Sequence, residues 1–137
     1  MSYLLDTVVL SALRRPDRHA DVVRWIRGRA ESELFISVVT LGEIERGISR
    51  QRGHDPIFAQ ALKLWLDQVL TLYGDRVLPV TTAIARRWGL LSGETGRDDI
   101  DLLIAATAQA HGLIVATRNV KHFERCDVAT LNPFGPP

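Results

Sequence analysis

Short apolar segments alternate with longer amphipathic segments along this chain, and the alternation limits the possible folds more than any other feature. The apolar segments are brief and bounded by polar or turn-forming residues, as buried strands are. They occupy residues 2–6, 33–38, 76–80, 113–117 and 127–133. Between these segments, apolar residues recur at the spacing of helices. Asp55 followed by Pro56 predicts the start of one helix, and Thr40 is the expected cap of another. Because alternating strands and helices form parallel crossovers, the sequence predicts an α/β fold with a doubly wound parallel sheet of about five strands flanked by helices.

Length and composition predict one domain over residues 1–137. A chain of this size with 46% hydrophobic residues can build a core without disulfides, and the single Cys126 excludes a disulfide framework and a thiolate metal cluster. The formal net charge of +1 excludes an acidic disordered tail and a polybasic nucleic-acid coat. No segment approaches the ~20 apolar residues that span a bilayer, and the N-terminal apolar run contains Asp6, unlike a signal peptide. We therefore expect a cytoplasmic protein without a membrane segment.

Four side chains with oxygen atoms stand just after predicted strands or at the start of the helices that follow them. They are Asp6, Glu43, Asp101 and Asn119. In doubly wound sheets, functional residues gather beyond the carboxyl ends of the strands. We therefore expect these four side chains to meet in one pocket at that edge of the sheet.

The predicted helix over residues 97–112 offers three acids for this pocket, Asp98, Asp99 and Asp101. Asp98 or Asp99 can cap the helix. Asp101 has apolar residues at i+3, i+4 and i+7, which puts it on the apolar face, where a charge needs a partner. Asp101 is therefore the preferred site residue. The alternative interpretations are a helix cap for a strand-end aspartate and a solvated helix residue for Glu43.

Three carboxylates in one cleft repel each other unless a cation lies among them or some take up protons. Oxygen ligands without Cys or paired His favour a hard divalent ion, Mg²⁺ or alternatively Mn²⁺. An ion held by Asp6, Glu43 and Asp101 can activate a water molecule for in-line attack on a phosphodiester. This donor set is suited to a metal-dependent nuclease.

The basic residues are arginines almost throughout, since Lys63 and Lys121 are the only lysines. Residues 14–29 form a locally basic segment. The planar guanidinium group suits phosphate oxygens, so this segment is a candidate rim for phosphate contacts. Biased codon usage and a solvated helix face predict the same composition.

Four segments carry a resemblance to a known family. They are LLDTVVLSAL, FISVVTLGEIERGI, DLLIAATAQAHGLIVATRNVKHF and DVATLNPF. Together they resemble the PIN-domain ribonuclease toxins, most closely the VapC/FitB type found in bacterial toxin–antitoxin pairs. The resemblance covers nearly the whole chain. Its most specific part is the D-x-x-I-A-A-T-A block followed by A-T-R-N.

The resemblance implies an Mg²⁺-dependent endoribonuclease that hydrolyses RNA and is neutralised by a cognate antitoxin. It also implies a homodimer, and a larger complex in which the toxin reaches operator DNA only through its antitoxin. Asp6, Glu43 and Asp101 match the three acidic positions of the family, with Asp6 and Asp101 as direct metal ligands. Asn119 matches a fourth catalytic position that is Asp in some members and Asn in others.

Thr117 and Arg118 match the polar pair beside that fourth position. The resemblance implies that Thr117 orients an acid or a water, and that Arg118 is structural or faces the phosphate. Two departures bear on activity: Val8 stands where members often have an orienting Asn, and Asn119 lowers the charge by one, which favours one metal. His122 stands where many members carry an acid; a general acid is one interpretation, and a surface histidine is the favoured one.

Two other functions remain open. One is a PIN domain that binds RNA or its antitoxin without effective catalysis, weakened by Val8 and Asn119. The other is a receiver-type phosphoacceptor domain, a small doubly wound sheet that also binds Mg²⁺. The receiver pattern fits poorly, because the chain has a single acid after the first strand, Val80 after the mid-chain strand and no Lys-Pro.

Overall fold

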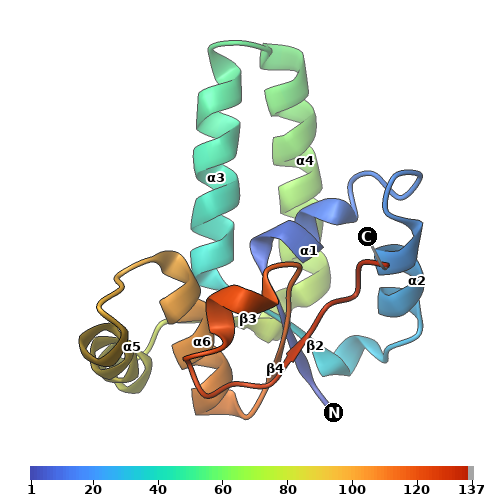
Figure 1. Ribbon diagram of the computed structural model, residues 1–137. Coiled ribbons are helices and arrows are strands. Elements are labelled where there is room, and N and C mark those ends of the chain that lie inside the picture. The colour runs from blue at the N-terminus through green and yellow to red at the C-terminus, as the bar shows by residue number, and fades with distance from the viewer. Residues whose placement is uncertain (136–137) are drawn as a thin grey trace.

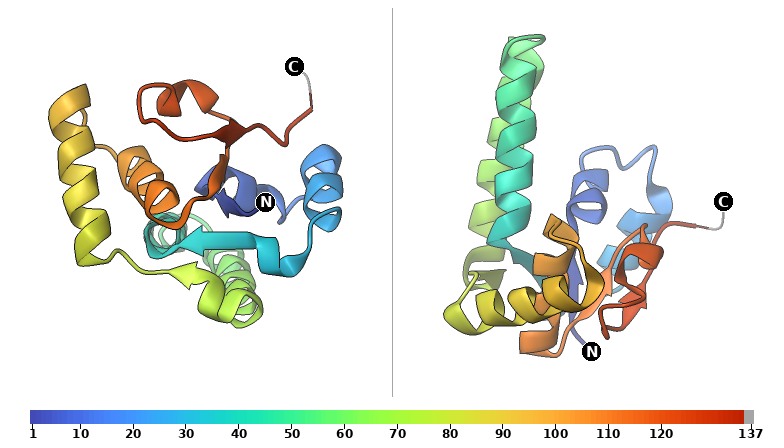
Figure 2. Two further views of the ribbon diagram at one scale, coloured as in Figure 1. Left: turned by 90° about the horizontal axis from the view of Figure 1, so that it is seen from below. Right: turned by 60° about the vertical axis from the view of Figure 1, so that its left-hand side comes forward.

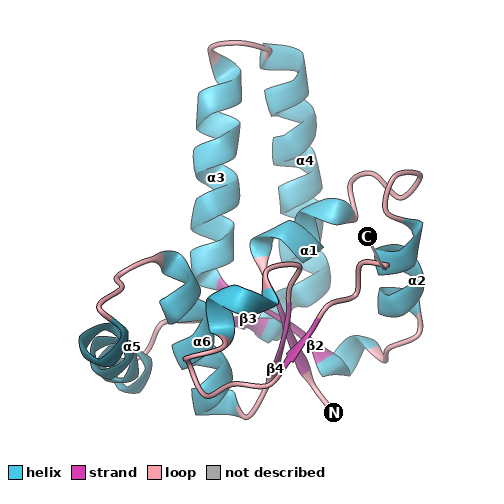
Figure 3. Ribbon diagram, in the orientation of Figure 1, coloured by secondary structure: helices cyan, strands magenta, loops and turns pink. Residues whose placement is uncertain are grey.

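The computed structural model describes residues 1–135 as a five-stranded parallel sheet with helices on both faces (Figures 1 and 3). The strands are β1 (Tyr3–Leu5), β2 (Leu34–Ser37), β3 (Val77–Leu78), β4 (Ile114–Ala116) and β5 (Thr130–Leu131). Their order in the sheet is β3-β2-β1-β4-β5, and every neighbouring pair is parallel. The predicted doubly wound α/β sheet is confirmed.

Six helices connect the strands, together with three short 3₁₀ turns. The helices are α1 (Thr7–Ala12), α2 (Ala20–Arg27), α3 (Val38–Arg52), α4 (Pro56–Tyr73), α5 (Thr82–Thr95) and α6 (Ile100–His111), and the turns are η1 (Glu31–Glu33), η2 (Gly74–Arg76) and η3 (Val120–Phe123). Helices α3 and α4 form a hairpin that projects beyond the sheet (Figures 1 and 2). Within residues 1–135, no helix has the length and apolar character needed to cross a membrane.

Helix caps fix where α3 and α4 begin. Asp55 Oδ1 accepts a hydrogen bond from the Phe58 backbone N–H at 3.1 Å, which confirms Asp55 as the cap of α4. The expected cap of α3 is wrong: Ser37, rather than Thr40, accepts from the Val39 N–H at 3.1 Å. The reason is that α3 starts directly where β2 ends, so Thr40 falls inside the helix and is buried there.

Alternate residues of the sheet face two separate cores, because successive side chains of a strand point to opposite faces. Tyr3 and Leu5 pack with buried residues of α1, α2, α3 and α4 on one face. Leu4 packs with buried residues of α5, α6 and η3 on the other. The central strands are therefore buried on both sides, as parallel sheets require.

The chain changes direction across the sheet between β1 and β4. It moves from β1 to β2 and β3 on one side and then returns to β4 and β5 on the other. Leu5 is in register with Ala116, and the Asp6 N–H donates to the Ala116 carbonyl at 3.1 Å. A doubly wound sheet opens a crevice at such a switch point. Helices α1 and α3 begin at this edge of the sheet, which is uppermost in Figure 1.

Candidate functional site

Asp6 is the central carboxylate of the switch point. It follows β1 directly, and only 5% of its surface is exposed. Its Oδ1 accepts a hydrogen bond from the Val9 N–H at 2.9 Å, so the side chain also caps α1. The end of a buried strand and the start of a helix together hold this carboxylate in one orientation.

Burial raises the pKa of Asp6 above its ordinary value, because desolvation disfavours the charged form. Hydrogen bonds from the Thr117 side chain and the Val9 backbone lower the pKa, while the nearby charges of Asp101 and Glu43 raise it further. No Lys or Arg side chain within residues 1–135 forms an ion pair with Asp6. Asp6 thus lies among like charges without a protein cation to balance them.

Glu43 reaches this edge from the second turn of α3. Its Oε1 accepts a hydrogen bond from the Thr7 hydroxyl, which also lies 3.4 Å from the Thr40 hydroxyl. Thr7 is the residue after Asp6, so this contact ties α3 to the start of α1. One oxygen of Glu43 is used in this contact and the other remains for a ligand.

Asp101 comes from the opposite face of the sheet, in the first turn of α6. Its Oδ2 lies 2.7 Å from His122 Nδ1 in η3. The negative charge of Asp101 contributes to the raised pKa of Asp6. The charge of a bound cation would reach both of them.

Arg97 fixes the start of α6 against η3. Its guanidinium contacts the Asp99 carboxylate at two points, 2.8 Å and 3.0 Å, and donates to the His122 carbonyl at 2.8 Å. Asp99 precedes the helix as its N-cap residue but forms no side-chain cap, because its carboxylate is engaged by Arg97, which lowers its pKa. Among Asp98, Asp99 and Asp101, only Asp101 contributes to the raised pKa of Asp6, and Asp98 is exposed.

The residues after β4 form the remaining wall. Thr117 is fully buried; it hydrogen-bonds the Asp6 carboxylate and accepts from the Asn119 backbone N–H at 2.9 Å. Asn119 is exposed at the start of η3. The Arg118 guanidinium stacks on the Phe134 ring, 3.9 Å from its centroid.

The donor set matches a hard divalent cation in charge and in atom type. A buried carboxylate with two like-charged neighbours and no basic partner is stabilised by such an ion. Within residues 1–135, however, no three His, Cys, Asp or Glu side chains already surround one point. Asp101 faces His122 and Glu43 faces Thr7, which accounts for the absence of a preformed three-ligand group.

Sequence reasoning missed two residues of this arrangement. Thr7 contacts Glu43, and His122 contacts Asp101 although it was favoured as a surface histidine. The His122 side chain is indeed 56% exposed, so both descriptions hold. The position of Thr7 beside Asp6 was a usable signal for the first contact, but nothing in the sequence signalled that η3 would bring His122 to α6.

The PIN domain family matches residues 3–128 of this chain. The chain belongs to the PIN domain family. Toxin FitB of Neisseria gonorrhoeae is 32% identical over 137 residues, covering 96% of this chain and 97% of that protein. Ribonuclease VapC14 of Mycobacterium tuberculosis is 42% identical over 74 residues, covering 53% of this chain and 72% of that protein.

A solved structure of FitAB bound to an IR36 DNA fragment contains a chain that is 29% identical to this one. The TM-score is 0.84, and the alignment covers 98% of this chain and 97% of that one. These likenesses place the chain with the VapC/FitB type of PIN domain, as the sequence motifs indicated. The PIN-like fold is confirmed, and the receiver-type alternative is set aside.

Proposed function

We propose that this protein is the toxin of a bacterial toxin–antitoxin pair and acts as a metal-dependent endoribonuclease that hydrolyses RNA phosphodiesters. The observation that carries the proposal is the buried Asp6 carboxylate at the β1–β4 switch point, close to the acids Asp101 and Glu43 and without a protein cation. The names of its relatives, a ribonuclease and a toxin, support the same activity.

The proposed metal ligands are Asp6, Glu43 and Asp101, with Mg²⁺ as the ion and Mn²⁺ as its alternative. A bound Mg²⁺ supplies positive charge that stabilises the negative charge developing on the scissile phosphate. Asp6 is the fixed ligand, because Val9 and Thr117 restrain its carboxylate. Thr7 and His122 orient the other two carboxylates.

In this proposal the RNA substrate reaches the carboxylate site from the side of η3. The Asn119 amide is exposed there and is the proposed hydrogen-bonding partner of the attacking water or of the scissile phosphate. Thr117, by contrast, is enclosed, so its role is to hold Asp6 and the Asn119 backbone. Val8 is exposed beside the site and contributes no polar group to it.

The proposed partners are a cognate antitoxin, an RNA substrate and a second copy of the chain, with operator DNA contacted only through the antitoxin. Helix α4 supports protein partners because it leaves Ile57, Leu64 and Leu72 more than half exposed. Apolar side chains at such exposure are typical of interaction surfaces. The relative in the DNA-bound FitAB structure supports the antitoxin and its link to DNA.

The decisive experiment measures cleavage of mixed single-stranded RNA at graded Mg²⁺ concentrations, with purified protein freed of antitoxin. We expect Asp6→Asn and Asp101→Asn to abolish metal-dependent cleavage. Asp98→Asn is the matched control, since this exposed acid stands three residues from Asp101 without lying among the site acids. Calorimetric titration with Mn²⁺ should give a binding signal for the wild type and the control that Asp6→Asn lacks.

Cleavage that survives both site substitutions would overturn the assigned site. Cleavage that is equally strong in a chelator would overturn the metal requirement. If wild-type protein binds RNA and Mn²⁺ but no preparation cleaves, the binding-only function is the correct one.

A further inference from the structure

A hollow of about 420 Å³ opens beside the carboxylate site on the α1 side, and its charged lining residues are all basic. We call it the arginine hollow, and its polar and aromatic lining consists of Thr7, Ser11, Arg14, Arg15, Arg18, His19, Arg118 and Phe134. Three of the arginines come from the loop after α1 and the fourth follows β4. The fold therefore brings together arginines that are about a hundred residues apart in the sequence.

These four guanidinium groups have no carboxylate partner among the described residues. The ion pairs of the described chain involve the N-terminus, Arg24, Arg97 and His122 instead. The six arginines of residues 14–29 thus divide by position. Arg14, Arg15 and Arg18 line the hollow, whereas Arg24 pairs with Asp21, and Arg27 and Arg29 lie elsewhere.

Aromatic rings hold two of the arginines in place. The Arg14 guanidinium lies 5.0 Å from the Phe58 centroid and 5.9 Å from that of Trp65, and Arg118 lies 3.9 Å from Phe134. Burial lowers the pKa of Arg14, and the positive charge of Arg15 lowers it further. Stacking restrains a guanidinium while its N–H groups stay available, so both arginines are oriented but unpaired. Such groups suit an anion that accepts several hydrogen bonds.

The hollow adjoins the carboxylate site through two residues. Thr7 lines the hollow and donates its hydroxyl hydrogen to Glu43. Arg118 follows Thr117, which hydrogen-bonds Asp6. A nucleic-acid strand bound at the carboxylate site would therefore run toward the arginines of the hollow.

Aromatic surface accompanies the positive charge. Phe134 and His19 meet edge to face with centroids 5.7 Å apart at the rim of the hollow. Single-stranded nucleic acid binds to surfaces that combine basic residues with aromatic rings. A second, smaller hollow shares Arg18, His19, Arg118 and Phe134 but adds Asp17 and Asp21, so the fully basic hollow is the better phosphate site.

We propose that the arginine hollow binds the backbone phosphates of single-stranded RNA next to the phosphate held at the carboxylate site. This inference rests on the proposed nuclease function, and it adds where the substrate lies and which residues hold it. The unpaired, pre-oriented guanidinium groups and their position beside the carboxylate site favour RNA over an acidic protein segment as the occupant.

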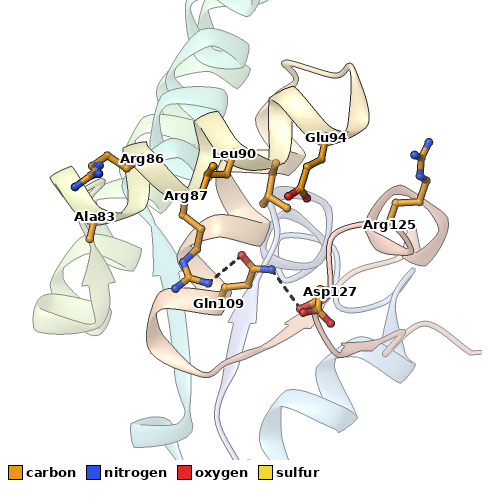
Figure 4. A pocket seen from close by; sticks show the side chains of 9 residues that line it. Ala83, Arg86, Arg87, Leu90, Glu94, Gln109, Arg125 and Asp127 are labelled. Atoms are coloured by element: carbon orange, nitrogen blue, oxygen red, sulfur yellow. Dashed lines mark hydrogen bonds between the residues drawn. The ribbon is translucent and has the colours of Figure 1, made fainter.

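A different hollow, of about 500 Å³ and lined by residues of α5 and α6, provides an internal control because it contains charges of both signs (Figure 4). It is lined by Arg86, Arg87 and Arg125 together with Glu94 and Asp127. Arg87 donates to the Gln109 side chain at 3.4 Å, which occupies one of its N–H groups (Figure 4). Phosphate binding is not favoured where acids offset the arginines.

The test measures binding of a fluorescein-labelled ten-nucleotide single-stranded RNA by anisotropy, at several NaCl concentrations. The protein is the full chain carrying Asp6→Asn, so that cleavage does not interfere. Arg14→Gln, Arg118→Gln and their combination are compared with Arg86→Gln, which changes the same charge in the mixed hollow. Glutamine retains part of the stem, and thermal unfolding of each variant checks that the fold is kept.

We expect each substitution in the arginine hollow to weaken binding about three- to tenfold, and the pair about tenfold or more. Each should also reduce the slope of log affinity against log salt by about 0.7, the value for one lost phosphate contact on a single strand. Arg86→Gln should change affinity less than twofold. A polyglutamate peptide of equal charge should displace the RNA poorly.

Three results would overturn the inference: unchanged affinity and salt slope in the arginine variants, an equal loss in Arg86→Gln, or displacement by polyglutamate as effective as by unlabelled RNA. The last would identify an acidic protein segment as the occupant. Failure of the nuclease proposal would look different. The wild-type protein would then not cleave RNA, but the arginine substitutions would still weaken RNA binding.

Discussion

The carboxylate site and the arginine hollow lie side by side at one edge of the sheet, yet the protein holds their charges in opposite ways. Asp6 is buried and hydrogen-bonded, and the charges of Asp101 and Glu43 raise its pKa. The arginines are more exposed, two of them are held by aromatic stacking, and none forms an ion pair among the described residues. Water stabilises unpaired charge at the surface but not in the interior.

The carboxylate site depends on a bound ion, whereas the arginine hollow does not depend on a ligand. The charges of Asp101 and Glu43 disfavour the ionised form of the buried Asp6, so a bound cation would relieve the repulsion at this carboxylate. Arg15, Arg18 and Arg118 are exposed and Arg14 is partly exposed, so RNA binding there adds affinity without relieving repulsion at a buried charge. Substitutions in the first region should change catalysis and stability, and those in the second should change substrate affinity alone.

After the loss of cleavage expected for Asp6→Asn and Asp101→Asn, the next largest effect is expected for Glu43→Gln, which keeps the side-chain volume and removes one charge from the carboxylate site. Cleavage at saturating RNA should fall about a hundredfold, the scale of losing one electrostatic contribution to the transition state. Glu45→Gln, an exposed neighbour on the same helix, is the matched control and should cleave normally. Single-turnover rates compare the two, and equal rates would remove Glu43 from the site.

A smaller effect, about tenfold in cleavage, is expected for Thr117→Ala. The Thr117 hydrogen bond lowers the pKa of Asp6, so its loss raises that pKa. Because Asp6 must be ionised to bind a cation, the acidic limb of the pH–rate profile should move to higher pH. Thr117→Ser keeps the hydroxyl and should restore the profile. A profile that stays in place in Thr117→Ala would show that this hydrogen bond does not tune Asp6.

Arg118→Gln is expected to act on binding alone. KM for single-stranded RNA should rise three- to tenfold with kcat about unchanged, as when an interaction is equal in the ground and transition states. Steady-state kinetics at two salt concentrations measure this, and the effect should shrink as salt rises. A fall in kcat at constant KM would place Arg118 at the reacting phosphate instead, and would erase the distinction between the two regions.

The smallest effect concerns stability. In a chelator at neutral pH, Asp6→Asn should unfold at a temperature about 3 °C higher than the wild type, because it removes a buried charge and asparagine still caps α1. The folded state binds the Asp6 proton more tightly than the unfolded chain. Wild-type stability therefore falls as pH rises from the ordinary pKa of 3.8 to the raised folded value, while the variant lacks this loss.

Differential scanning calorimetry from pH 3 to pH 7 tests that prediction. Mg²⁺ should raise the unfolding temperature of the wild type and leave Asp6→Asn unchanged. A variant that is less stable than the wild type at every pH would show that the Asp6 charge is balanced in the folded protein.

Local chemistry allowed much of the fold and part of the site to be predicted. Asp6 ends a short apolar run, and Asp101 stands out from Asp98 and Asp99 through the apolar residues that follow it at helical spacing. The same reasoning failed at Thr40, because the length of β2 decides which hydroxyl caps α3 and the sequence does not fix where a strand stops. Asp99 likewise is held by Arg97 in place of a capping contact.

Periodicity and capping act within a few residues, so the order of strands and helices, the helix start at Asp55 and the acids at the strand ends can be read from the amino-acid sequence. The contacts of His122 with Asp101 and of Thr7 with Glu43, and the hollow shared by Arg14 and Arg118, become visible only in the folded protein. These pairs depend on which elements lie side by side: β1 beside β2 for Thr7 and Glu43, β1 beside β4 for the arginines, and α6 beside η3 for Asp101 and His122. That neighbourhood is set by packing over the entire core, which no local pattern encodes.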